Sequence, residues 1–279
     1  MKITSGQLRF PGSTSAPWPW PWLLRASVAV HALALVAALA LPGAVPWVIG
    51  LVALNHLVIT VAGLLPRCDW LGQNMTRLPA AAAARGEVAL TIDDGPDPEV
   101  TPAVLDLLDA AGQRATFFCI AQRVQALPEL ARMIVARGHS IQNHTARHEH
   151  TFSLLGPRAC AAEIEQAQTV LEQITGARPV VFRPPAGLRN VFLAPTLHRL
   201  GLQQVSWTRR GFDTRETDAG KVLARLVRGL RAGDILLLHD GHAARGANGR
   251  PVVRDVLPQL LARLQAAGLR SVTLPQALT

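Results

Sequence analysis

The sequence contains no tyrosine, and aromatic residues of all kinds make up only 5% of the chain. Cysteine is also scarce, because the chain has only Cys68, Cys119 and Cys160, which form no Cys-x-x-Cys pair. An odd number of cysteines without such a framework argues against a disulfide-stapled scaffold and is compatible with a reducing compartment. No internal repeat is visible, so nothing predicts a repeat architecture.

Acidic residues are scarce as well: 19 Asp and Glu stand against 28 Lys and Arg, which gives a net charge of +9. A strongly basic protein is attracted to anionic partners such as membrane surfaces, phosphates or nucleic acids. No segment resembles a nucleic-acid-binding module, and the arginines are scattered over the predicted helices. We therefore expect no nucleic-acid partner.

Two long apolar runs lie near the N-terminus. Residues 23–41 are nearly all apolar apart from Arg25 and His31, and a second apolar run carries Asn55 and His56 at its middle. Each run approaches the roughly 20 residues that a helix needs to cross a bilayer. A cleaved signal peptide would leave the second run unexplained, and two buried helices of a soluble domain are a further alternative. We predict a membrane anchor of two helices.

This anchor divides the chain. We expect a flexible N-terminus at residues 1–22, the two-helix membrane anchor at 23–66, a linker at 67–86 and a folded domain at 87–279. The Ala-rich stretch inside the linker is expected to be featureless or a short helix. The linker is too short to let the folded domain move far from the bilayer.

The residues that flank the two runs predict their orientation. Basic residues gather on one side of the expected hairpin, and the break between the helices has none. By the positive-inside bias, both chain ends then face the cytoplasm, and we expect a bacterial inner-membrane protein with its folded domain on that side. The basic residues are Lys2, Arg9, Arg25, Arg67, Arg77 and Arg85; Trp18, Trp20, Trp22 and Trp70 would lie at that interface, and Trp47 at the other.

From residue 87 onward, apolar strand patterns alternate with helical patterns, which predicts an α/β fold with parallel strands. Periodicity leaves open whether the sheet closes. The expected strands are 88–92, 115–120, 140–143, 180–182, 204–207, 235–238 and 271–274, and the expected helices are 101–111, 127–136, 161–174, 194–200, 219–230 and 252–266.

Two motifs carry candidate metal chemistry. The adjacent acids Asp93 and Asp94 follow an apolar run and precede Gly-Pro, so they lie at the end of a predicted strand; a solvated Asp-rich turn is the plainer alternative. His144 and His148 are spaced to face the same way on one helical turn, so both imidazoles would reach one metal ion. With one carboxylate they would form a three-ligand site that leaves positions open for water and substrate.

Two further motifs lie downstream. Arg183 begins the rigid loop RPPAG after an apolar pair, and His239 ends the apolar strand ILLLH. Taken alone, Arg183 reads as an ordinary ion pair, Asp213 as a turn residue and His239 as a half-buried structural histidine. Polar strand-end residues at several places in one α/β chain are instead typical of an active site at the top of a barrel.

Together these motifs resemble the polysaccharide deacetylase family, also called the NodB-homology or carbohydrate esterase 4 family. Four of its five motifs are clear: TIDDGP at 91–96, HTARH at 144–148, RPPAG at 183–187 and ILLLH at 235–239. The resemblance implies a distorted (β/α)7 barrel. It also implies hydrolysis of the acetamide of an N-acetylhexosamine, and one bound divalent metal ion, for which zinc is our first choice and Co, Ni or Fe are alternatives.

The resemblance also implies roles for the site residues. Asp94, His144 and His148 would bind the metal, and Asp93 would be the general base. His139, His150 and His242 match no motif and are expected to be structural. The remaining roles are His239 as general acid, Asp213 to orient it, Arg183 to pair with Asp93, and the loop of Pro184, Ala186 and Gly187 to bind substrate, with the Ala186 N–H as oxyanion donor.

The fourth motif is degraded. The family often has Asp-x-x-Asp-Trp, whereas this chain keeps only the second acid, Asp213, and has Arg210 at the place of the first. Loss of the Trp and gain of a positive charge fit a small or anionic substrate better than neutral chitin. Arg189, Arg209 and Arg210 are candidates for contact with a phosphate.

With the predicted anchor, this favours the branch of the family that deacetylates amino sugars carried on polyprenyl phosphate. We therefore predict an N-acetylhexosamine on undecaprenyl phosphate as substrate, for lipid A modification. The alternatives are an exported peptidoglycan or chitooligosaccharide deacetylase and, from another class, a catalytically silent membrane-anchored sugar-binding protein.

Overall fold

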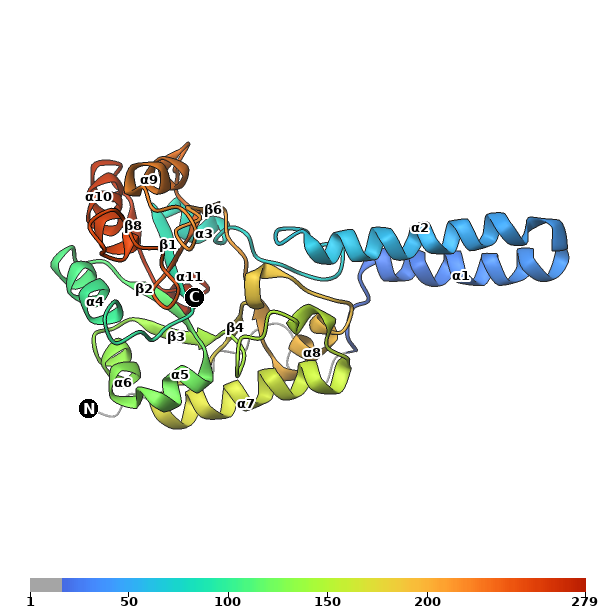
Figure 1. Cartoon of the computed structure of the whole chain (residues 1–279), viewed down its shortest axis with the longest axis horizontal. Helices are drawn as coiled ribbons and strands as arrows, with labels where there is room; N and C mark the ends of the chain where they lie inside the picture. Colours follow the sequence, from blue (N-terminus) through green and yellow to red (C-terminus); the bar gives the residue numbers. More distant parts are fainter. Residues whose placement is uncertain (1–16) are drawn as a thin grey trace.

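The computed structural model describes residues 17–279. Most of the predicted flexible N-terminus, including Lys2 and Arg9, therefore lies outside the described residues. The described part begins with two long helices, α1 (Trp22–Ala40) and α2 (Val45–Leu64), joined by the 3-10 turn η1 (Pro42–Ala44). They lie side by side and project from the rest of the chain as a hairpin (Figure 1).

The hairpin exposes apolar side chains along most of its length. Leu39 is 76% exposed and Trp47, near the tip, is 82% exposed. Both helices are long and apolar enough to cross a bilayer. Such a surface is compatible with a membrane anchor or with a signal sequence.

The base of the hairpin is packed against the folded domain. The N–H of Arg189 donates to the carbonyl of Gly63 (3.1 Å), and a side chain at Gly63 would overlap the carbonyl of Arg189. Leu23, Ala62 and Leu71 form a small buried cluster at this junction. The end of α2 is therefore held against the loop that follows the RPPAG motif.

The segment between hairpin and domain also belongs to the fold. Met75 donates its N–H to the carbonyl of Gln204 (3.0 Å), and Leu78 donates to Gly233 (2.8 Å), so this segment lies between the two ends of the sheet. The short helix α3 (Ala80–Ala84) follows and leads directly into the first strand. Residues 75–78 thus lie in the seam that the strands leave open.

The sheet confirms the predicted α/β fold. Its strands run in the order β5-β4-β3-β2-β1-β7-β6, β8 pairs with β1, and every strand pairing is parallel. Among the described residues no ladder joins β5 to β6, so the sheet forms a half-barrel. The strands are β1 (Glu87–Asp93), β2 (Ala115–Cys119), β3 (Ser140–Asn143), β4 (Val181–Phe182), β5 (Gln203–Gln204), β6 (Arg209–Arg210), β7 (Ile235–His239) and β8 (Arg270–Ser271).

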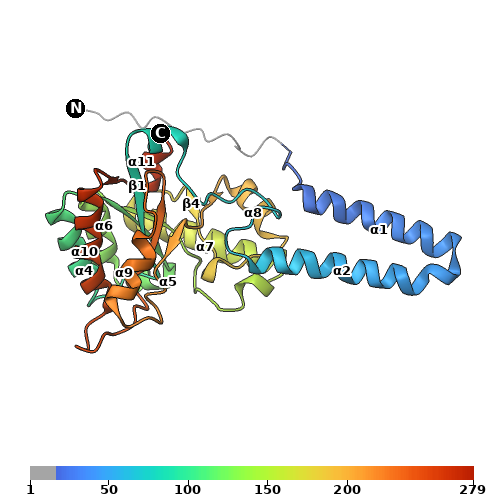
Figure 2. The ribbon, with the colours of Figure 1, turned by 90° about the horizontal axis from the view of Figure 1, so that it is seen from above.

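Helices alternate with the strands and surround the sheet (Figures 1 and 2). The largest apolar core lies between β1, β2 and β7 and the helices α4, α9 and α10, where Leu105, Leu108, Val256 and Leu260 are fully buried. The helices are α4 (Thr101–Ala110), α5 (Ala121–Ala126), α6 (Pro128–Ala136), α7 (Pro157–Thr175), α8 (Leu193–Leu200), α9 (Ala219–Val227), α10 (Val252–Ala266) and α11 (Leu274–Ala277), with 3-10 turns η2 (Phe152–Leu154) and η3 (Pro185–Gly187).

Three expectations about elements were wrong. The strand expected at 271–274 ends at Ser271, because Thr273 caps α11 in a capping box with Gln276. The strand β6 was missed because Arg209–Arg210 is short and charged and carries no apolar signal. Helix α5 was missed because six residues are too few for a clear helical period.

Candidate active site

The register of the parallel strands brings the motif residues to one edge of the sheet. Asp93, the last residue of β1, is the partner of Phe118 in β2 and of His239 in β7. Asn143 in β3 is the partner of Phe182 in β4. Because parallel strands end at the same edge, the residues that follow these strands meet the Asp pair there.

The turn after β1 positions the second acid. Asp94 has a left-handed backbone (φ 74°), and its N–H donates to the carbonyl of Phe118 (3.1 Å). Side chains at Gly95 or Gly241 would overlap Asp240 and the carbonyl of Asp94, respectively. The two glycines therefore let the turns after β1 and β7 approach each other closely.

Asp94, His144 and His148 form a compact cluster whose ligand atoms all lie within 4.8 Å of one another. The Oδ1 atom of Asp94 lies 3.2 Å from the Nε2 atom of each histidine. Burial lowers the pKa of His148 to about 4, and the neighbouring His144 adds to this, so the His148 ring is neutral at neutral pH.

The hydrogen bonding of His144 sets which ring nitrogen faces Asp94. Its Nδ1 lies 2.7 Å from the carbonyl of Arg183, which can only accept, so Nδ1 carries a proton. Nε2 is therefore the nitrogen that can bind a metal ion together with Asp94 Oδ1. One carboxylate and two imidazole nitrogens are a donor set that suits a divalent transition metal.

The histidines do not lie on one helical turn, and that prediction is wrong. Thr145 and His148 both have left-handed backbones, with φ of 68° and 58°. The Asn143 side chain accepts from the N–H of Thr145 (2.9 Å), and the Thr145 hydroxyl accepts from the N–H of His148 (2.9 Å). These side chains compete with helical hydrogen bonds and fold a loop that still turns both imidazoles to Asp94.

Asp93 is paired with a fully buried arginine. The Nη1 atom of Arg183 donates to Asp93 Oδ1 (2.6 Å), and Nη2 donates to the carbonyl of Ser206 (2.7 Å). The guanidinium lies 4.1 Å from the ring centre of Phe118. These contacts fix the carboxylate 3.9 Å from His144 Nε2, next to the cluster but outside it.

His239 is held by Asp213. The backbone N–H and ring Nδ1 of His239 donate to the two carboxylate oxygens of Asp213, at 2.7 and 2.9 Å. Burial by itself lowers the pKa of His239, but the carboxylates of Asp213, Asp93 and Asp94 together outweigh it, Asp213 most of all, and raise the pKa to about 9. His239 is therefore protonated at neutral pH, and its Nε2 proton is free to be donated.

The loop after Arg183 borders these groups. Pro184 is buried, whereas Ala186 is exposed and has φ of 54°. The N–H of Ala186 donates no hydrogen bond within the described part of the chain. A side chain at Gly187 would press on Trp207 and Pro66, so this loop lies against the segment that follows α2.

Two residues at the site were missed by sequence reasoning. His242 lies 2.9 Å from Asp94 Oδ2 through Nδ1, and its Nε2 accepts from Arg123 (3.1 Å), so Nδ1–H donates to the carboxylate. Asp240 is buried beneath the turn, where Thr101 donates to it (2.5 Å) and burial raises its pKa to about 7. Their position directly after the ILLLH motif was the available signal.

The other two unassigned histidines contribute no ligand atom to the cluster. His139 is buried and accepts from the N–H of Ala115 (3.2 Å), which is a structural role. His150 is exposed, with its ring centre 6.3 Å from that of His148.

Sequence comparison identifies the family. Residues 80–205 match the family described as Polysaccharide deacetylase. A peptidoglycan-N-acetylglucosamine deacetylase of Bacillus cereus is 35% identical over 193 residues, which cover 68% of this chain and 87% of that protein. A chitooligosaccharide deacetylase of Azorhizobium caulinodans is 32% identical over 201 residues, with 68% of this chain and 94% of that protein covered.

Solved structures agree. The peptidoglycan deacetylase PdaC from Bacillus subtilis superposes with a TM-score of 0.61 at 27% identity, covering 69% of this chain and 89% of that one. A family 4 carbohydrate esterase from Streptomyces lividans superposes with a TM-score of 0.60 at 30% identity, covering 67% and 91%. With its metal-ligand cluster at the carboxyl edge of a parallel half-barrel, this chain belongs to the polysaccharide deacetylase family of metal-dependent N-acetyl-sugar hydrolases.

Proposed function

We propose that this protein removes the acetyl group from N-acetylglucosamine residues of a saccharide such as a chitooligosaccharide or peptidoglycan. The observation that carries the proposal is the convergence of Asp94, His144 and His148 beside two prearranged acid–base pairs. The relatives named for these two substrates support the choice of sugar.

Asp94, His144 and His148 would hold one divalent ion, for which zinc is the first choice. When bound, such an ion polarises the amide carbonyl and lowers the pKa of a water molecule. The structural reason for assigning the ligands in this way is that Arg183 occupies one oxygen of Asp93, whereas Asp94 faces both imidazoles.

The chain's own groups would then move the protons. Asp93, fixed by Arg183, would accept a proton from the attacking water, and the exposed N–H of Ala186 would stabilise the developing oxyanion. His239, kept protonated by Asp213, would donate a proton to the departing amine nitrogen. These roles are the ones that the family motifs imply for the loop Pro184–Gly187 and for Asp93, Arg183, Asp213 and His239.

Acetate release from purified full-length protein tests this proposal. We expect zinc-loaded protein in detergent to release acetate from chitotetraose or peptidoglycan. Treatment with a chelator should abolish release, and added zinc should restore it. If the metal-loaded protein released acetate from none of the N-acetyl sugars, the proposal would be contradicted.

A second candidate substrate is an N-acetylhexosamine on undecaprenyl phosphate, used in lipid A modification. The contact of the hairpin base with the substrate loop favours it, because Gly187 lies against Pro66 and Arg189 pairs with Gly63. A membrane-anchored hairpin would place the site close to the bilayer surface. The basic flanks favour the cytoplasmic side of a bacterial inner membrane.

Two measurements separate the candidates. A C-terminal fusion to a fluorescent protein or to alkaline phosphatase reports on which side of the membrane the C-terminus lies. We expect the fluorescent fusion, which reports a cytoplasmic C-terminus, to be the active one. Mass spectrometry of lipid-linked sugars from cells with intact protein or Asp93→Asn should show accumulation of the acetylated lipid in the variant. An external domain with an unchanged lipid profile favours the cell-wall substrate. Nothing in the geometry favours a catalytically silent sugar-binding protein, because the three expected metal ligands Asp94, His144 and His148 converge.

A further inference from the structure

Arg189, Arg209 and Arg210 were the candidates for contact with a phosphate, and the protein itself already engages two of them. Arg189 is 4% exposed and donates to the carbonyl of Cys68. Arg209 donates to the carboxylate of Asp234 and to two backbone carbonyls. These two guanidinium groups serve the fold and are not available to a ligand.

Arg210 differs from both. Within the described part of the chain its side chain has no carboxylate partner and donates no hydrogen bond, and its Nε atom is buried without a partner. Its guanidinium lies between two aromatic rings, 5.2 Å from the centre of Trp207 and 5.0 Å from that of Phe212. Burial of Nε without an acceptor costs free energy, which an acceptor on a bound ligand would recover.

Arg210 borders the active site. The guanidinium of Arg183, which holds Asp93, lies 5.8 Å from the centre of the same Trp207 ring. Burial lowers the pKa of Arg183, Asp93 opposes this, and the positive charge of Arg210 lowers it further, so the two arginines are within electrostatic reach. Gly187 of the substrate loop also contacts Trp207.

Phe212 also borders the solvent. It lines a hollow of about 280 Å³ together with Arg215, Glu216 and Arg225. Within that hollow Glu216 accepts from Arg225 (3.0 Å), so their charges offset each other. Phe212 is 48% exposed, and its ring centre lies 5.0 Å from the guanidinium of Arg210 and 5.8 Å from that of Arg225.

A second basic residue connects Arg210 to the hairpin. The exposed Arg67 lies just beyond the end of α2 and donates to the carbonyl of Thr208 (3.3 Å), two residues before Arg210. If α2 spans a bilayer, this region lies at the level of the headgroup phosphates. A guanidinium fork matches the geometry of two phosphate oxygens.

We propose that Arg210 binds a phosphate group carried by the N-acetyl sugar and so selects phosphorylated over neutral substrates. This specificity role rests on the deacetylase function proposed above and, of the two candidate substrates given there, favours the phosphate-linked sugar. The Asp of the family motif at this place would repel such a phosphate, whereas Arg210 attracts it.

Kinetics of the zinc-loaded full chain in detergent test the proposal with N-acetylglucosamine 1-phosphate, its undecaprenyl ester in micelles, and neutral chitotetraose. Arg210→Gln should raise KM for the phosphorylated substrates about tenfold or more, the range of a lost charge-assisted hydrogen bond. It should change KM for chitotetraose by less than about twofold. Arg210→Lys should keep part of the preference. A larger effect on the ester assigns the phosphate to a lipid, and an equal effect assigns it to a free sugar phosphate.

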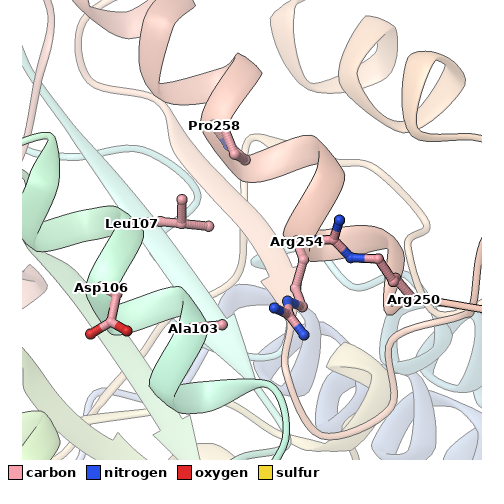
Figure 3. A pocket seen from close by; sticks show the side chains of 6 residues that line it. All are labelled: Ala103, Asp106, Leu107, Arg250, Arg254 and Pro258. Carbon is pink, nitrogen blue, oxygen red and sulfur yellow. The ribbon is translucent and has the colours of Figure 1, made fainter.

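Arg254 offers a matched control. It is also a half-buried arginine beside a surface hollow, but that hollow lies between α4 and α10, away from the hairpin (Figures 1 and 3). The hollow is lined by Ala103, Asp106, Leu107, Arg250, Arg254 and Pro258. Arg254→Gln should leave KM unchanged for both the phosphorylated and the neutral substrates.

Equal losses on charged and neutral substrates in Arg210→Gln would show that Arg210 only supports Trp207, and would overturn the proposal. So would an unchanged preference. Calorimetric binding of N-acetylglucosamine 1-phosphate to Asp93→Asn protein, with and without Arg210→Gln, decides the matter without turnover. If the parent chain releases no acetate from any substrate, the deacetylase function fails separately, and this binding comparison still tests Arg210.

Discussion

The two adjacent carboxylates after β1 have different neighbours, and these neighbours divide the chemistry between them. Asp93 faces the buried guanidinium of Arg183, whereas Asp94 faces His144 and His148. Asp93 ends the strand and Asp94 begins the turn with a left-handed backbone, so the two side chains point in different directions. One residue of displacement thus separates the proposed base from the proposed ligand.

Asp93→Asn tests this division. An amide cannot accept the proton of water, so we expect kcat to fall by about 10²–10⁴ while bound metal, measured by mass spectrometry, stays near one per chain. His144→Ala should lose both metal and activity. A near-normal rate in Asp93→Asn would show that the base is another group.

Asp213→Asn tests the second acid–base pair. Asp213 raises the pKa of His239, so its removal lowers that pKa, and the protonated imidazole disappears at a lower pH. The alkaline limb of the kcat/KM profile should therefore move to lower pH, while the acidic limb stays. An alkaline limb that does not move would remove His239 from the role of acid.

At the scale of elements, the site depends on how closely the turns after β1 and β7 approach. Gly241 has an ordinary backbone conformation, but a Cβ there would overlap the carbonyl of Asp94 and the side chain of Arg123. His242 follows immediately and donates to Asp94. The turn after β7 therefore affects the position of Asp94, the proposed metal ligand that follows β1.

We expect Gly241→Ala to lower the free energy of unfolding by about 1–3 kcal/mol, the usual cost of overpacking a close contact. It should also weaken zinc binding, because Asp94 must shift. Denaturant titration and metal competition measure the two effects. Gly156→Ala is the control, since nothing lies within 4 Å of a Cβ there; equal behaviour of the two variants would contradict the steric argument.

The histidine loop is an element that local spacing misjudged. Four-residue spacing suits a helix, yet Asn143 and Thr145 bind backbone N–H groups and favour a loop. Asn143 is itself held by the carbonyl of Ile164 and the side chain of Gln168 in α7. The loop therefore depends on a helix twenty residues away, which spacing alone cannot reveal.

For the whole molecule, the apolar hairpin is the feature that bears on location. Trp22 and Trp70 are in contact near its base, with ring centres 5.4 Å apart, and Trp47 is exposed near its tip. Such a distribution is typical of aromatic residues at the two interfaces of a bilayer. The folded domain is attached at the base, so its active-site edge would remain near the membrane surface.

We expect the full chain to stay in the membrane fraction after alkaline carbonate extraction. Its measured mass should include both apolar segments, whereas a cleaved signal sequence would leave a shorter mature protein. Mass spectrometry of the purified protein distinguishes the two, and release of an uncleaved chain into the soluble fraction would contradict both.

The sequence by itself determined the family, the parallel α/β fold and the motif residues expected at the site. It did so because motif residues that directly follow strands in a parallel sheet must meet at one edge. The tertiary structure alone decided that Arg210 has no hydrogen-bond or ion-pair partner among residues 17–279, that His242 joins Asp94, and that residues 75–78 lie in the seam of the half-barrel. These features depend on contacts between segments far apart in the chain, and no local pattern encodes such contacts.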